Sequence, residues 1–127
     1  MHNAFYIVQE HIQGITLDAL IGKLTPDRAQ TYFRGIVQGI CSFHKSAGIV
    51  HGGIRPQHII IASNGYAKIA EWGTSLIASF QKNSFKVGKA QFYVAPENII
   101  NSNICRMSSD IWALGVTLYS MLREICF

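Results

Sequence analysis

The chain has 127 residues, of which 49% are apolar and 14% are charged. This length suits one domain rather than two, and the apolar content is sufficient for a core, which argues against intrinsic disorder. The charged fraction is well below the roughly one quarter of an ordinary soluble domain. A surface with so few charged residues predicts that a partner covers part of it.

The charge distribution and the apolar stretches exclude two kinds of partner. The 11 Lys and Arg exceed the 7 Asp and Glu by a formal charge of +4, but they are spread along the chain, which argues against nucleic acid binding. The longest charge-free apolar stretch, residues 111–122, is shorter than the about 20 residues that a membrane-spanning helix needs. We therefore expect neither a nucleic acid nor a membrane partner.

The N-terminal residues and the cysteines predict a location. The first residues show neither the basic lead nor the apolar run of a signal peptide. Cys41, Cys105 and Cys126 lie far apart and fit neither a disulfide framework nor a paired metal motif. We predict reduced, mostly buried thiols and a cytoplasmic or nuclear protein.

The first third of the chain predicts a strand followed by two helices. Residues 4–10 are aromatic and β-branched, which favours a strand broken by Gln13 and Gly14, and a brief helix is expected over residues 16–21. Thr25 as N-cap and Pro26 at the first helical position then begin a long amphipathic helix that ends at Gly48.

Two glycines interrupt this predicted long helix. Gly35 and Gly39 each cost about 1 kcal/mol relative to Ala, and their spacing places both on one helical face. We expect close packing on that face to compensate.

The remainder predicts a hairpin, an irregular stretch and a final helix. Residues 59–61 and 66–69 read as two short strands joined through Asn64 and Gly65. Residues 74–94 are polar and irregular. A helix over residues 110–123, capped by the preceding serines, is apolar on nearly every face, so we expect other segments to surround it.

Four patterns, in order along the chain, resemble the landmarks of a protein kinase catalytic domain. The segment His51-Gly52-Gly53-Ile54-Arg55-Pro56-Gln57-His58 stands where that family has H-R-D-L-x-x-x-N. Glu71-Trp72-Gly73 stands in place of D-F-G and Ala95-Pro96-Glu97 in place of A-P-E. Residues 109–116 are similar to the central helix of the larger kinase lobe. Together they make the resemblance specific.

The resemblance covers nearly the whole chain and implies an α+β, mainly helical fold: a kinase-like C-lobe fragment with a hinge strand and a small β-hairpin. Residues 5–12 match the last small-lobe strand and the hinge. The glycine-rich loop, the strand lysine and the partner glutamate of the family are not in the sequence. We expect residues 1–127 to form a partial kinase-like domain without the N-lobe and the last C-lobe helices.

The residues that would carry phosphoryl transfer differ from the family pattern. Gly53 occupies the position of the catalytic aspartate, and loss of a general base costs about 10²–10⁴-fold in rate. Arg55 occupies the lysine position, where a planar guanidinium does not replace a point-like ammonium. His51 is either a catalytic base or, as we favour, a packed histidine that organises the loop. No competent catalytic residue is therefore expected.

The metal-binding positions are also altered. His58 stands at the asparagine position, and its imidazole is a poor ligand for Mg²⁺, which prefers oxygen. Glu71 keeps the charge of the D-F-G aspartate but adds a methylene group. The two residues are either a metal-binding pair with impaired affinity or polar residues that line an inactive cleft. Trp72 is expected to fill the core. Asp110, at a helix start, is expected to accept backbone N–H groups, and the resemblance implies that these are the N–H groups of the loop.

The resemblance also implies a nucleotide shelf. Gln9 would be the gatekeeper, the backbone of Glu10 and Ile12 the hinge, and Leu17 with Ile60 the apolar floor. A shelf without a roof buries too little of a ligand to bind it tightly. We therefore expect no required cofactor, which leaves weak ATP and Mg²⁺ binding open.

Three functional hypotheses follow. The favoured one is a catalytically impaired, pseudokinase-like module that acts by binding a protein, such as another kinase or a kinase substrate. The alternative is a serine/threonine protein kinase domain that binds ATP and becomes active only when completed by the missing segments. The third is a gene fragment without a stable fold.

Overall fold

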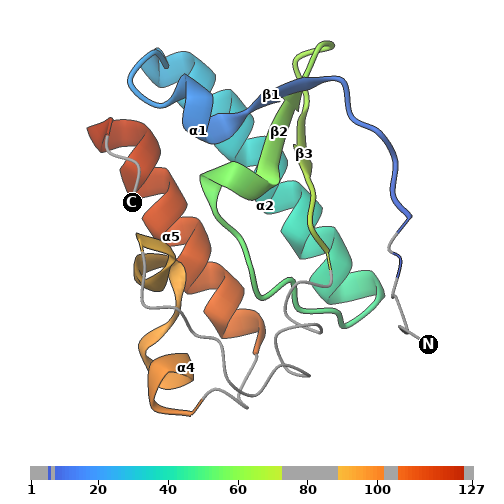
Figure 1. The fold of residues 1–127 in the computed structure, drawn as a ribbon, viewed down its shortest axis with the longest axis vertical. Helices are drawn as coiled ribbons and strands as arrows, with labels where there is room; N and C mark the ends of the chain where they lie inside the picture. The colour runs from blue at the N-terminus through green and yellow to red at the C-terminus, as the bar shows by residue number, and fades with distance from the viewer. Residues whose placement is uncertain (1–5, 7, 73–88, 102–105, 125–127) are drawn as a thin grey trace, which may run out of the picture.

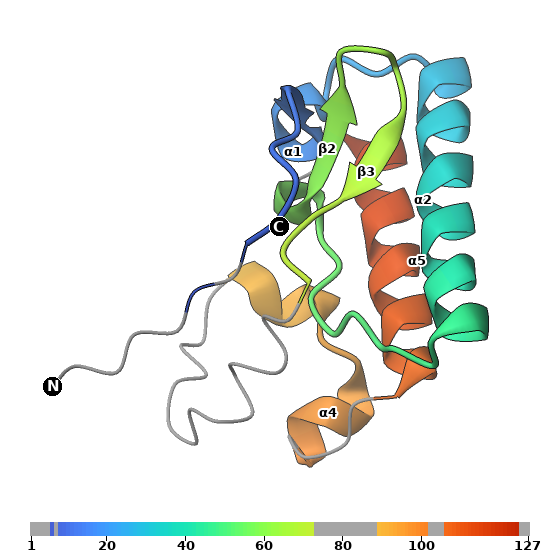
Figure 2. The same cartoon turned by 90° about the vertical axis from the view of Figure 1, so that its right-hand side faces the viewer.

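The computed structural model describes residue 6 and residues 8–72, 89–101 and 106–124. Four α-helices, two 3-10 turns and a small sheet are found in these ranges. Figures 1 and 2 show the sheet on one side of the long helix α2 and the helix α5 alongside α2. The described part therefore has the predicted α+β, mainly helical architecture.

The long helix α2 spans Pro26–Ser46 and follows its sequence signals closely. The Oγ1 atom of Thr25 accepts a hydrogen bond from the backbone N–H of Arg28 at 3.4 Å, and Pro26 occupies the first turn. Gly48, at φ = 62°, follows the last turn in the left-handed conformation that favours glycine. Both predicted ends are confirmed, as is the short helix α1 at Leu17–Leu20.

The sheet has three antiparallel strands in the order β1-β2-β3. Its predicted hairpin is confirmed, with β2 at Ile59–Ala62 and β3 at Ala67–Ile69. Strand β1 (Gly14–Thr16) pairs with β2, so that Ile15 lies opposite Ile61.

The predicted strand over residues 4–10 is wrong for the residues that the structure describes. Tyr6 and residues 8–10 have no strand pairing, and the strand begins at Gly14, where a break was expected. Gly14 permits the strand pairing that is found instead. A Cβ atom on residue 14 would lie 2.2 Å from the carbonyl oxygen of Ile61, so only glycine lets the chain approach β2 this closely.

The C-terminal part contains two turns and two helices. The 3-10 turns are η1 (Pro56–His58) and η2 (Lys89–Tyr93), and the helices are α4 (Pro96–Ile100) and α5 (Met107–Arg123). Most of the predicted irregular stretch, residues 74–88, lies outside the described residues.

Helix α5 begins earlier than predicted. Its N-cap is Arg106, and the two serines expected to cap it lie inside the first turn. The Oγ atom of Ser109 donates to Oδ1 of Asn98 at 3.0 Å and accepts from the Arg106 N–H at 3.5 Å. A bond to a neighbouring segment thus fixes Ser109, which sequence spacing could not reveal.

The core lies between the sheet, α2 and α5. It is built from aliphatic side chains, including Leu17, Ile36, Ile40 and Ile59, which are completely buried. Full burial of one such side chain contributes about 1.5–3 kcal/mol. Gly35 and Gly39 face β3, where an added Cβ would meet Ala67 at 3.8 Å and Ile69 at 3.3 Å, so the predicted close packing is confirmed.

Several apolar side chains of α5 are not covered. Ile111, Trp112, Tyr119 and Leu122 are exposed, although the sequence led us to expect a surrounded helix. Cys41 is also exposed, against the prediction of mostly buried thiols, and Cys105 and Cys126 lie outside the described residues. Within the described ranges, no helix has the length and apolar character needed to cross a bilayer.

Candidate functional site

The loop of residues 51–58 begins at a buried anchor provided by α5. The side chain of Asp110 is only 1% exposed, and its two oxygens accept the backbone N–H groups of His51 and Gly52, each at 2.8 Å. Its Oδ2 atom also lies 2.8 Å from Nε2 of His44, near the end of α2. One carboxylate thus ties the loop to two helices, which confirms the role expected of Asp110.

His51 uses both ring nitrogens to shape the loop. Its Nε2–H donates to the carbonyl of Ala70 at 2.9 Å, and its Nδ1 accepts the N–H of Gly53 at 3.1 Å. The ring is completely buried, and this burial lowers the pKa of His51, against the opposing effects of the Ala70 carbonyl and the Asp110 carboxylate. The geometry is that of a neutral, structural histidine.

The second half of the loop is closed by its own side chains. Nδ1–H of His58 donates to the carbonyl of Gly53 at 2.7 Å, and Nε2 of His58 accepts from Nε–H of Arg55 at 3.2 Å. Burial lowers the pKa of His58, the Gly53 carbonyl opposes that shift, and the Arg55 charge adds to it. Gly53 itself contributes only backbone atoms, both of which are bonded to histidines.

This closure bears on the metal pair suggested by the sequence. His58 has no lone pair left for a cation, because its Nε2 already accepts from the positively charged Arg55. Glu71 is exposed and has a φ of 60°, an unusual conformation for a residue other than glycine. Among the described residues, no group of three or more metal-ligating side chains comes together. Within the described ranges, the ring nitrogens of His58 are therefore not placed as ligands of an octahedral Mg²⁺ site, and weak Mg²⁺ binding remains a prediction.

Trp72 fills the space between the loop and α2. Its ring stacks on Phe43 with 4.0 Å between centroids and meets the edge of His51 at 4.5 Å. Its Nε1–H donates to the carbonyl of Ile69 at 2.9 Å. The side chain is therefore part of the packing, as expected. Gly73, the next residue of this pattern, lies outside the described ranges.

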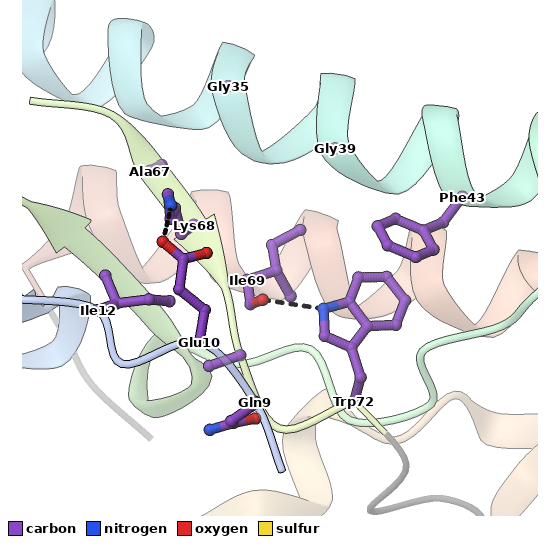
Figure 3. A pocket seen from close by; sticks show the side chains of 11 residues that line it. Gln9, Glu10, Ile12, Gly35, Gly39, Phe43, Ala67, Lys68, Ile69 and Trp72 are labelled. Carbon is purple, nitrogen blue, oxygen red and sulfur yellow. Dashed lines mark hydrogen bonds and ion pairs between the residues drawn. The ribbon is translucent and has the colours of Figure 1, made fainter.

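The five residues of the predicted nucleotide shelf fall into two groups. Gln9, Glu10 and Ile12 line a trough beside β3 (Figure 3), and neither Leu17 nor Ile60 lines that trough. Leu17 is completely buried in the core, whereas Ile60 is half-buried on β2, opposite Lys68 of β3. The nucleotide shelf remains a prediction.

Two contributors were missed at the sequence level. His44 lies within the predicted long helix and was given no role, yet it pairs with Asp110. Lys68 was read only as a strand residue, yet its Nζ forms an ion pair with Glu10. A polar residue at a core-facing helical position was the available signal for His44, while no local pattern could have paired residues 10 and 68.

A loop anchored by the first turn of a helix and followed by a hairpin agrees with the large kinase lobe that the sequence resemblance implies. Comparison with known families agrees, because the protein kinase domain matches residues 1–126. The chain belongs to the protein kinase domain family.

Named relatives are similar over most of this chain. It is 35% identical to 3-phosphoinositide-dependent protein kinase 1 of Arabidopsis thaliana, over 94% of this chain and 27% of that protein. It is 32% identical to the serine/threonine-protein kinase PrkC of Bacillus subtilis, over 93% of this chain and 19% of that protein. It is 30% identical to the CBL-interacting serine/threonine-protein kinase 15 of Arabidopsis thaliana, over 92% of this chain and 29% of that protein. The chain thus spans less than a third of the length of each.

Proposed function

We propose that this chain is a catalytically impaired kinase-fold module that acts by binding a protein. The observation that carries the proposal is Gly53 at the position of the catalytic aspartate. Phosphoryl transfer relies on positioning, metal-held charge and a carboxylate that orients the attacking hydroxyl. No residue of the loop 51–58 supplies a carboxylate.

The hydrogen bonding of the loop supports the same proposal. His51 and His58 are the two loop side chains that could move a proton, and both engage their two ring nitrogens in bonds within the protein. The guanidinium of Arg55 points its Nε–H at His58. A loop that satisfies its own donors and acceptors keeps its shape without nucleotide or metal, which suits a binding role.

A protein partner is supported by the uncovered face of α5. The exposed residues Ile111, Tyr119 and Leu122 lie on this helix, and contiguous exposed apolar surface is typical of interaction sites. Another kinase or a kinase substrate is the partner class that we propose. The spread positive charge gives no support for nucleic acid.

The alternative function is an ATP-dependent serine/threonine kinase that works after completion by further segments. The names of the relatives favour it, since all three that are named above are called kinases, and Glu71 keeps a carboxylate at the D-F-G position. In that case Glu71 and Arg55 would act in altered roles.

A phosphotransfer assay distinguishes the two. The purified chain is incubated with radiolabelled ATP, Mg²⁺ or Mn²⁺ and a generic protein substrate, beside a heat-killed control and the Glu71→Ala variant. The proposal predicts no incorporation above the heat-killed control. Incorporation that the Glu71→Ala change abolishes would establish the alternative.

A thermal melt followed by circular dichroism tests the fragment hypothesis. A cooperative transition is expected, because the described residues form one packed core. A featureless melt would instead support a fragment without a stable fold.

A further inference from the structure

A trough of about 360 Å³ runs along β3, apart from the loop 51–58. Helix α2 forms one wall and residues 9–12 form the other, with β3 as the floor (Figure 3). Its volume is within the range of about 300–1,000 Å³ that small-molecule pockets occupy. Its size therefore fits a compact molecule.

The α2 wall is flat because two of its residues lack side chains. Gly35 and Gly39 both line the trough, so the helix presents backbone there instead of side chains. An added Cβ at residue 35 would meet nothing closer than the Ala67 Cβ at 3.8 Å. This wall therefore suits the face of a planar group.

One end of the trough is aromatic and the other is charged. Phe43 and Trp72, stacked at 4.0 Å, lie at one end, while Lys68 and Glu10 meet at the other (Figure 3). Aromatic rings favour further aromatic contacts. The two charged side chains are 38% and 66% exposed, and such an exposed pair is weak enough for a ligand anion to take the place of Glu10 beside Lys68.

We propose that this trough binds a flat aromatic molecule that carries one anionic group. The rings lie over β3, between the glycine wall and residues 9–12, with an edge toward Phe43 and Trp72, and the anion contacts Nζ of Lys68. The proposal is independent of the proposed function, because it uses none of the loop residues 51–58 and makes no statement about phosphoryl transfer.

The first experiment fills the trough. The probe is 8-anilinonaphthalene-1-sulfonate, titrated into the 127-residue chain carrying Trp112→Phe, so that energy transfer to the probe comes from Trp72. Adding Gly35→Leu is expected to weaken binding at least about tenfold, since the leucine occupies the space of the rings. The matched control is Gly115→Leu on α5, where a Cβ meets nothing within 4 Å, and it is expected to leave binding unchanged.

The second experiment tests the cation. Lys68→Met is expected to weaken sulfonate binding about two- to fivefold and to leave the neutral analogue N-phenyl-1-naphthylamine unaffected. Equal weakening of both probes would overturn the assignment of the anion to Lys68.

A third measurement needs no substitution. In amide NMR spectra of the unaltered chain, the sulfonate probe is expected to shift the signals of Gly35, Gly39 and Lys68 and to spare Gly115. Shifts centred on α5, or equal binding losses in the Gly35→Leu and Gly115→Leu variants, would overturn the proposal. If the Gly35→Leu variant fails to fold, the NMR shifts of the unaltered chain test the proposal by themselves.

Discussion

The two halves of the loop 51–58 are held in different ways. The first half, at His51 and Gly52, is fixed from outside by the buried carboxylate of Asp110. The second half, from Gly53 to His58, is closed by bonds among its own residues. The difference teaches that bonds to a distant helix hold the start of the loop, whereas local bonds hold the part that includes Gly53, Arg55 and His58.

The largest expected effect comes from breaking the external anchor. Asp110→Ala leaves the buried N–H group of His51, the N–H group of Gly52 and the imidazole of His44 without their acceptor, so we expect a loss of about 3–5 kcal/mol in unfolding free energy. Urea denaturation followed by circular dichroism measures this. Asp27→Ala, in the exposed first turn of α2, is the control and should cost below about 1 kcal/mol. Equal losses for the two would show that the anchor contributes little.

A smaller loss is expected when the aromatic support of the loop is removed. Trp72→Ala deletes the stacking on Phe43 and the edge contact with His51, which should cost about 2–3 kcal/mol for a partly buried ring. Trp112→Ala is the matched control, because Trp112 is exposed, and its loss should stay below about 1 kcal/mol. Urea titrations of both variants measure the two losses in unfolding free energy. A larger loss for Trp112→Ala than for Trp72→Ala would contradict the packing role of Trp72.

His58, in the second half of the loop, is expected to make the unfolding free energy depend on pH. Burial lowers the pKa of His58 below its ordinary 6.5, so above pH 6.5 the ring is neutral in both states and its contribution is fully present. As the pH falls below 6.5 the unfolded chain takes up the proton first, and stability is lost at up to about 1.4 kcal/mol per pH unit until the lowered pKa is passed.

The His58→Asn variant isolates this contribution. Unfolding free energies measured between pH 7.5 and pH 5.5 should fall less steeply in the variant, while His51, whose pKa is lowered by its own burial, contributes in both proteins. Identical slopes would show that His58 is not held neutral.

The smallest effect is expected at the rim of the trough. Lys68→Met removes an exposed ion pair with Glu10 and should change the unfolding free energy by less than about 1 kcal/mol. Lys23→Met, at an exposed turn, provides the comparison in the same urea titration. A loss above about 2 kcal/mol would mean that the pair is structural and would weaken the case for a replaceable Glu10.

Local signals predicted much of the fold. Thr25 and Pro26 predicted the start of α2, and Asn64-Gly65 predicted the β2–β3 hairpin, because caps and tight turns depend on adjacent residues. The strand at β1 was missed, since its position depends on how closely Gly14 approaches Ile61, a residue far away in sequence.

The candidate site shows the same division. The acceptor role of Asp110 was predicted, because the resemblance to the kinase family implied that a carboxylate at this helix start accepts backbone N–H groups of the loop. The hydrogen bonds that join His58 to Gly53 and to Arg55 were not predicted, since they depend on side-chain directions within a turn. Leu17 and Ile60 do not line the trough. Their spacing in the sequence could not show this, because it depends on which face of the folded sheet each residue occupies.

The shared anchor has a kinetic consequence. The bonds of Asp110 to Gly52, His51 and His44 span 58, 59 and 66 residues, whereas the β2–β3 hairpin closes over a few. Bringing chain segments so distant together costs more conformational entropy than closing a short loop does. We therefore expect the hairpin to form early during folding and the amides of His51 and Gly52 to become protected late, when α5 docks against α2.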